Sequence, residues 1–106
     1  MYRQGDVLLV PYSGVPAEAQ PEPVQNGRVV LAEGERTGHA HTMLADRVAF
    51  FREDGAGRGG YLRVDGLDPV ALSHEEHATV QVPPGNYRVI QQREYLPRSG
   101  PRRVSD

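Results

Sequence analysis

Turn-forming residues interrupt this chain so often that long helices have little room. Its 106 residues include 12 glycines and 9 prolines, and both residue types concentrate in turns. Residues 13–26 carry Pro16, Pro21 and Pro23, and proline lacks the amide donor that a central strand needs. We therefore expect an exposed loop there, closed by the strong turn signal Asn26-Gly27.

Short apolar runs, each about the length of a β-strand, lie between these turns. Ser73 with Glu76 three residues later has the form of a capping box, so we expect a single helical turn over residues 73–78. No other stretch favours a helix. The pattern predicts an all-β fold, a small single-domain barrel or sandwich of about seven to eight short strands. The expected strands are 7–12, 28–32, 39–44, 48–51, 61–64, 70–72, 79–82 and 87–90.

The length of the chain suits one domain with a modest core. We expect this β domain to cover residues 1–95. Residues 96–106 contain two prolines, one glycine and three arginines, and they are expected to form an extended C-terminal tail.

The composition argues against several kinds of site and partner. With no cysteine, the chain can form neither a disulfide nor a thiolate metal site, and a cytoplasmic location is favoured. No apolar run approaches the roughly 18 residues that span a bilayer, so no membrane association is expected. The net charge of -2 argues against nucleic acid as a partner. The arginines that could support nucleic-acid binding are Arg88, Arg93, Arg98, Arg102 and Arg103.

The four histidines form two tight pairs, His39-Ala40-His41 and His74-Glu75-Glu76-His77. Side chains alternate along a strand, so His39 and His41 are predicted to share one face. His74 and His77 can face together in a helical turn or a bulge. We predict that the two pairs meet in space at one site.

Imidazole is the commonest protein ligand for transition metals. The candidate ligands are His39, His41, His74 and His77, and the expected cofactor is a divalent transition metal such as Zn, Ni, Fe or Mn. Glu75 and Glu76 are the candidate catalytic bases. Glu33, Glu35 and Asp46 are further possible oxygen ligands or outer-shell acceptors. A cluster of this kind can also bind an anion, or serve only the structure of a loop.

These motifs resemble those of the cupin superfamily. His39-Ala40-His41 is similar to the H-x-H motif, Asp46 sits where the family usually has glutamate, and Pro83-Pro84-Gly85 resembles the later P-x-G turn. Arg88 departs from the pattern, since it stands where the second motif has a histidine. The resemblance implies a small metal-binding β-barrel, with Asp46 as an additional ligand and either His74 or His77 replacing the missing one. An inward-facing Arg88 would instead bind an anionic ligand.

Two functions from different classes remain open. The first is a cupin-like protein that binds a divalent metal and could be a metal-dependent enzyme acting on a small molecule. The second is a non-catalytic accessory module that binds a protein partner, with structural histidines. The cupin resemblance also implies that the protein can form a homodimer, because small cupin-like barrels often dimerise.

Overall fold

The computed structural model describes residues 1–33, 38–53, 59–92, 95–96 and 100–101. Within these residues the chain is built of β-strands joined by turns, and the predicted all-β class is confirmed. The strands are β1 Tyr2–Gln4, β2 Val7–Pro11, β3 Gln20–Pro21, β4 Arg28–Glu33, β5 Ala40–Leu44, β6 Val48–Arg52, β7 Gly59–Val64, β8 Val70–Ser73, β9 Val80–Val82, β10 Gly85–Gln91, β11 Tyr95–Leu96 and β12 Gly100–Pro101.

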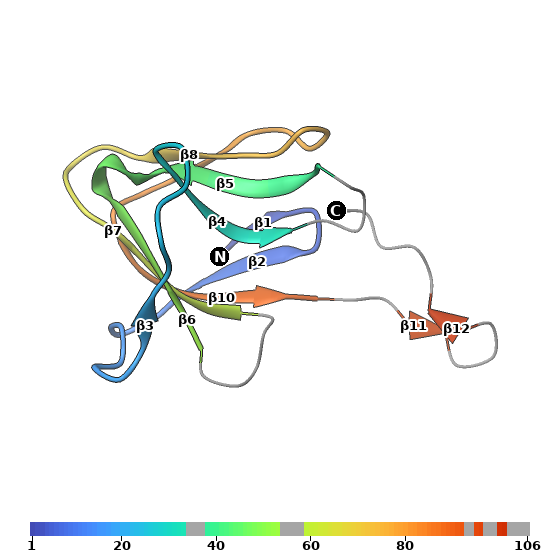
Figure 1. Cartoon of the computed structure of the whole chain (residues 1–106), viewed down its shortest axis with the longest axis horizontal. Coiled ribbons are helices and arrows are strands. Elements are labelled where there is room, and N and C mark those ends of the chain that lie inside the picture. The colour runs from blue at the N-terminus through green and yellow to red at the C-terminus, as the bar shows by residue number, and fades with distance from the viewer. Residues whose placement is uncertain (34–37, 54–58, 93–94, 97–99, 102–106) are drawn as a thin grey trace.

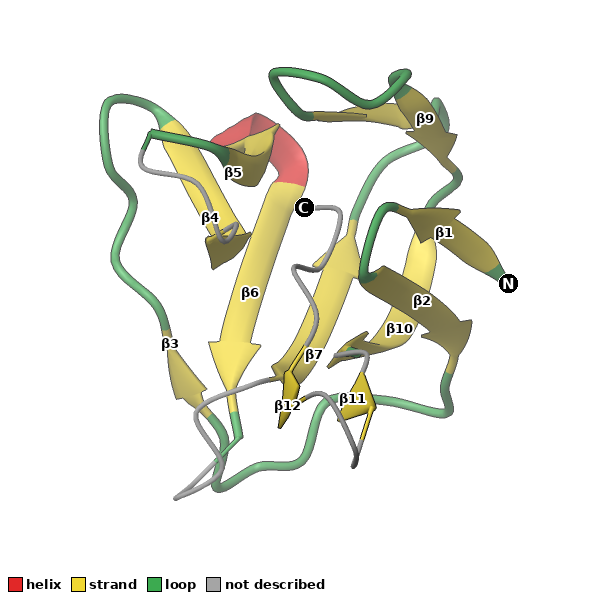
Figure 2. Ribbon diagram, turned by 90° about the vertical axis from the view of Figure 1, so that its right-hand side faces the viewer, coloured by secondary structure: helices red, strands yellow, loops and turns green. Residues whose placement is uncertain are grey.

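Two antiparallel sheets form the domain. The larger has the strand order β1-β2-β10-β7-β6-β3, and the smaller has the order β4-β5-β8-β9. Figure 1 shows β5 and β8 lying above β2 and β10. In Figure 2 the strands β6, β7, β10, β2 and β1 follow one another around the core, with β4 near one end and β9 near the other.

The sheets approach each other at those ends, where β1 contacts β9 and β4 contacts β6. No hydrogen-bonded ladder joins them within the described part of the chain, so the sheets are not closed into a barrel. Of the two predicted architectures, a barrel and a sandwich, the structure therefore has the two-sheet arrangement of the sandwich. The strands β11 and β12, which follow β10 in the chain, pair with each other.

The core lies between the two sheets. Its most deeply buried apolar side chains come from both, as alternation along each strand requires. They include Leu9, Phe50, Leu62 and Val89 from the larger sheet, and Val29, Met43, Leu72 and Val82 from the smaller. His41 is the one histidine among the fully buried side chains, with 0% of its surface exposed.

The turn predicted at Asn26-Gly27 is confirmed. Asn26 has a φ of 52° and Gly27 a φ of 74°, and positive φ at both central residues is the signature of the hairpin turn that matches strand twist. Gln25 and Arg28 bridge across it. Asparagine and glycine tolerate this conformation better than other residues.

The helical turn predicted over residues 73–78 is wrong. The helical element that the described residues contain is a 3-10 turn at Ala45–Arg47, whereas residues 75–77 form bends. The imidazole of His74 explains the difference. Its Nδ1 accepts the backbone N–H groups of Glu76 at 3.0 Å and His77 at 3.3 Å, so a side chain takes the place of the helical carbonyl acceptor.

No helix in the described residues is long and apolar enough to cross a membrane.

Candidate metal site

The four histidine rings lie together. Ring centroids are 4.4 Å apart for His41 and His74, 4.7 Å for His74 and His77, and 5.5 Å for His39 and His74. The ring of His77 is stacked on that of His41, with centroids 6.3 Å apart and planes inclined by 12°. The predicted meeting of the two pairs is therefore confirmed.

The pairing of two strands brings the histidines together. β5 and β8 are antiparallel neighbours, with Thr42 opposite Ser73 and Met43 opposite Leu72. The beginning of β5 therefore lies beside the end of β8. His39 precedes β5 and His74 follows β8, so both emerge at the same edge of the smaller sheet.

His41 is held by two side chains from the larger sheet and the turn beside it. Its Nδ1 lies 2.9 Å from Gln4 Oε1, and its Nε2 lies 3.1 Å from Asp6 Oδ1. Gln4 must present its oxygen to His41, because its amide nitrogen donates to the carbonyls of Leu72 and Ala78 at 2.9 Å each. Both nitrogens of His41 are thus engaged within the protein.

The protonation of His41 follows from this environment. Burial lowers the pKa of His41 below its ordinary value, the imidazole of His74 acts in the same direction, and Asp6 opposes both. Because Gln4 Oε1 can only accept, Nδ1 of His41 carries a proton and donates it to this oxygen, and Nε2 faces the carboxylate of Asp6.

A possible ligand set lies beside His41. His39, His74 and Glu75 each offer one ligand atom, and these three atoms lie within 4.8 Å of one another. The carboxylate of Glu75 is already oriented, since its Oε1 accepts the N–H of Ala40 at 2.8 Å. That hydrogen bond is the main reason why the pKa of Glu75 is lowered. Glu75 is therefore an ionised carboxylate, which suits a metal ligand better than a general base.

A metal at His74 would compete with the hydrogen bonds of the following turn. A neutral imidazole that coordinates through one nitrogen carries its proton on the other. If Nε2 binds the metal, Nδ1 is protonated, and if Nδ1 binds it, the lone pair of Nδ1 is used. In both cases the bonds from Glu76 and His77 to Nδ1 are lost.

Zn²⁺ addition is accordingly expected to move the backbone amide resonances of Glu76 and His77 in ¹H–¹⁵N NMR spectra. Each lost hydrogen bond costs about 1 kcal/mol, which coordination must offset. The amide of Ala71, inside β8, serves as the control because it pairs with Gln81 across the sheet. Unchanged resonances of Glu76 and His77 at saturating Zn²⁺ would show that His74 does not coordinate.

Other predicted residues lie around this set. The Nε2 atom of His77 is buried and has no hydrogen-bond partner in the described part of the chain. Glu76 Oε1 lies 3.7 Å from His39 Nδ1. Glu33 ends β4 and is exposed, and Asp46 is exposed in the 3-10 turn after β5, at the opposite end of that strand from His39. Glu35 lies outside the described residues.

Arg88 lies on the outer face of the larger sheet. Its neighbours on β10, Tyr87 and Val89, are buried in the core, so alternation directs Arg88 the other way. Its guanidinium pairs with Glu53 at 2.7 Å and lies 4.9 Å from the centroid of the Tyr61 ring. The inward orientation needed for an anion site among the histidines is therefore not found.

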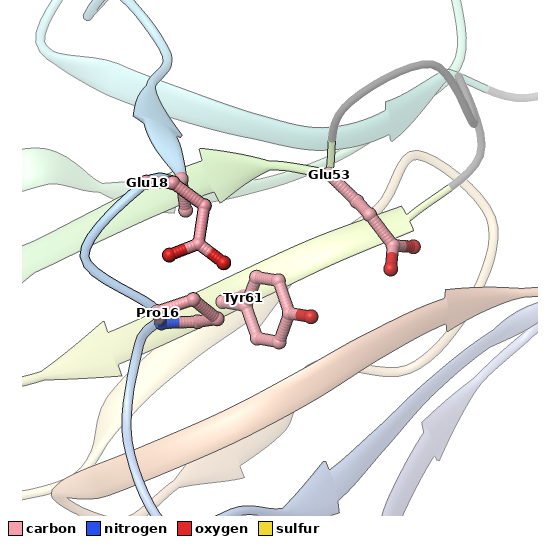
Figure 3. A pocket seen from close by; sticks show the side chains of 5 residues that line it. Pro16, Glu18, Glu53 and Tyr61 are labelled. Atoms are coloured by element: carbon pink, nitrogen blue, oxygen red, sulfur yellow. The ribbon is translucent and has the colours of Figure 1, made fainter.

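A cavity of about 270 Å³ is lined in part by Glu53 and Tyr61, the two residues that Arg88 contacts. Residues of the proline-containing loop line it together with residues of the sheet, and none belongs to the histidine cluster. In Figure 3 the ring of Tyr61 lies between the side chains of Glu18 and Glu53. The lining residues are Pro16, Glu18, Ala19, Glu53 and Tyr61.

Sequence reasoning missed Gln4 and Asp6, which contact His41, and Gln91, which contacts Asp6. None of the three was among the residues predicted to form the site. Yet Gln4 is 2% exposed and Asp6 5% exposed, and Gln91 donates to Asp6 Oδ2 at 3.0 Å. The one sequence signal for them was Gln4-Gly5-Asp6 directly before the apolar run of β2. Polar side chains beside a buried strand need hydrogen-bond partners.

Comparison with known proteins gives one match. Residues 3–92 match the model of a family described as a domain of unknown function, DUF8820. No curated protein and no solved structure matches the chain. The matched range contains all four histidines as well as Gln4, Asp6 and Gln91, and it covers most of the chain. The protein therefore belongs to the DUF8820 family.

Proposed function

We propose that this protein binds one divalent transition metal ion through His39, His74 and Glu75. The observation that carries the proposal is the convergence of these three residues, whose ligand atoms lie within 4.8 Å of one another. They come from two segments about 35 residues apart, which the pairing of β5 with β8 and the hydrogen bond from Ala40 to Glu75 bring together. Two imidazoles and one carboxylate are a donor set suited to Zn, Fe, Mn or Ni.

The surroundings support a metal at this position. Glu75 supplies a negative charge, and its pKa is lowered, so no proton has to be displaced from it near neutral pH. His77 supplies a buried nitrogen that no described residue satisfies. Buried polar atoms are normally paired, and a metal ion or a water bound to it would satisfy this one.

As a metal-dependent enzyme, the protein would use Glu76 rather than Glu75 as its base. Glu76 lies beside His39, whereas the carboxylate of Glu75 accepts the backbone N–H of Ala40, which lowers the pKa of Glu75. A carboxylate next to a metal ligand can take a proton from a metal-bound water. Glu76→Gln would then remove activity while leaving metal affinity nearly unchanged.

The test is the metal content and affinity of protein purified without a histidine tag. After incubation with Zn²⁺, Mn²⁺, Fe²⁺ or Ni²⁺ and removal of the excess, we expect about one ion per chain for the best-suited metal. His39→Ala, His74→Ala and Glu75→Gln should each weaken binding by about 100-fold or more, beyond the cost of outer-shell changes. Glu18→Gln, a carboxylate far from the cluster in sequence and exposed, is the matched control.

No bound ion in the wild type under any of these conditions would overturn the proposal. Equal binding by His39→Ala and the wild type would overturn the assigned ligand set. In the first case the histidines have a structural role, and the accessory-module function becomes the one to pursue, beginning with the cavity beside Tyr61 (Figure 3).

A further inference from the structure

The side chain of Gln4 forms hydrogen bonds at both ends of the segment that carries His74, Glu75 and His77. Gln4 Nε2 donates to the carbonyl of Leu72, just before this segment, and to the carbonyl of Ala78, just after it. Both distances are 2.9 Å, and Gln4 is buried. One amide group of the larger sheet thereby fixes how far apart the two ends of the segment lie.

The side-chain amide of Gln91 makes similar contacts at the end of β4, on the side of the chain that leads to His39 in the sequence. Gln91 Nε2 donates to the carbonyl of Glu33 at 3.0 Å and to Asp6 Oδ2 at 3.0 Å. Glu33 is the last residue of β4 and precedes His39 by six positions in the sequence. The end of β4 is thus tied to β10 of the larger sheet.

His41 lies between the hydrogen bonds of Gln4 and those of Asp6 and Gln91. It contacts Gln4 through Nδ1 and Asp6 through Nε2, while its ring lies against those of His74 and His77. A buried polar network in which every member is satisfied holds a unique arrangement of its parts. Neither nitrogen of His41 is available to a metal without breaking this network.

We propose that Gln4, Asp6, His41 and Gln91 are positioning residues that hold His39, His74 and Glu75 at metal-binding distance. The inference rests on the proposed metal site and deepens it. It separates the two histidines of the H-x-H motif into a ligand, His39, and a residue that orients the ligand segments, His41. Groups of this kind around metal ligands typically change metal affinity by about 10- to 100-fold when removed.

The experiment replaces single glutamines by methionine, which has a similar length but cannot form these hydrogen bonds. Gln4→Met releases both ends of the 73–77 segment, and Gln91→Met releases Glu33. Gln81→Met is the matched control, because Gln81 is exposed on β9. Co²⁺ titration followed by visible absorption reports both affinity and coordination geometry, and circular dichroism checks that each variant is folded.

We expect Gln4→Met and Gln91→Met to bind Co²⁺ about 10- to 100-fold more weakly, with an altered visible spectrum, and Gln81→Met to match the wild type. A purely structural role would lower the unfolding temperature while leaving the affinity and spectrum of folded protein unchanged, and that result would overturn the positioning role. Should Gln4→Met not fold, Gln91→Met, with its half-buried side chain, decides alone. A wild type that binds no metal overturns the proposed function and this inference together.

Discussion

Replacing His41 with alanine is expected to lower the free energy of unfolding of the metal-free protein by about 3–5 kcal/mol, the cost of removing one partner from a buried charged or hydrogen-bonded pair. The substitution leaves Gln4 Oε1 and Asp6 Oδ1 without their shared partner. It also opens a cavity beside the rings of His74 and His77. Domains of this size are stable by only about 5–15 kcal/mol, so the variant should be close to unfolding. Urea denaturation in the presence of a chelator measures the effect.

The control is His77→Ala under the same conditions. His77 belongs to the same cluster but is only half-buried, and its Nε2 has no partner among the described residues. We expect its loss to change the free energy of unfolding by less than about 1 kcal/mol. Equal effects of the two substitutions would contradict the network around His41. The chelator ensures that no metal contributes to either measurement.

Leu72→Ala is expected to destabilise the protein by about 2–5 kcal/mol. Leu72 is 0% exposed and lies on β8, where it pairs with Met43 of β5 and Val80 of β9. Truncation removes buried apolar surface and leaves a cavity that the surrounding strands can fill only in part. Because β8 leads directly into His74, the metal affinity of the folded variant should fall as well. Thermal unfolding and Co²⁺ titration measure the two effects.

Leu67→Ala provides the matched control for this change. Leu67 is 95% exposed, so the same atoms are removed without a cavity. Surface substitutions of this kind usually stay within about 0.5 kcal/mol of the wild type. A large effect at Leu67 would mean that this leucine is covered in solution, for example by a second copy of the chain. A small effect at Leu72 would contradict the core assignment.

Local patterns predicted most of the strands, because alternation and turn chemistry act over a few residues. Asn26-Gly27 forces its turn through backbone conformation alone, and the run from Val7 to Val10 forms a strand between a turn and a proline-containing loop. The helical turn at Ser73 failed for an equally local reason. Its capping-box pattern competed with the imidazole of His74, which accepts the same backbone N–H groups.

The sequence by itself determined that the fold is all-β and that two histidine pairs stand out, since composition and spacing are properties of the chain. Only the tertiary structure decided which histidine does what. His39 and His41 look equivalent in sequence, yet His39 precedes β5 of the smaller sheet, whereas His41 is enclosed by Gln4 of β1 and Asp6 of the turn after β1. Those contacts join residues 35 and 37 positions apart, and no short-range pattern encodes them, because burial and hydrogen-bond partners arise only when the two sheets pack.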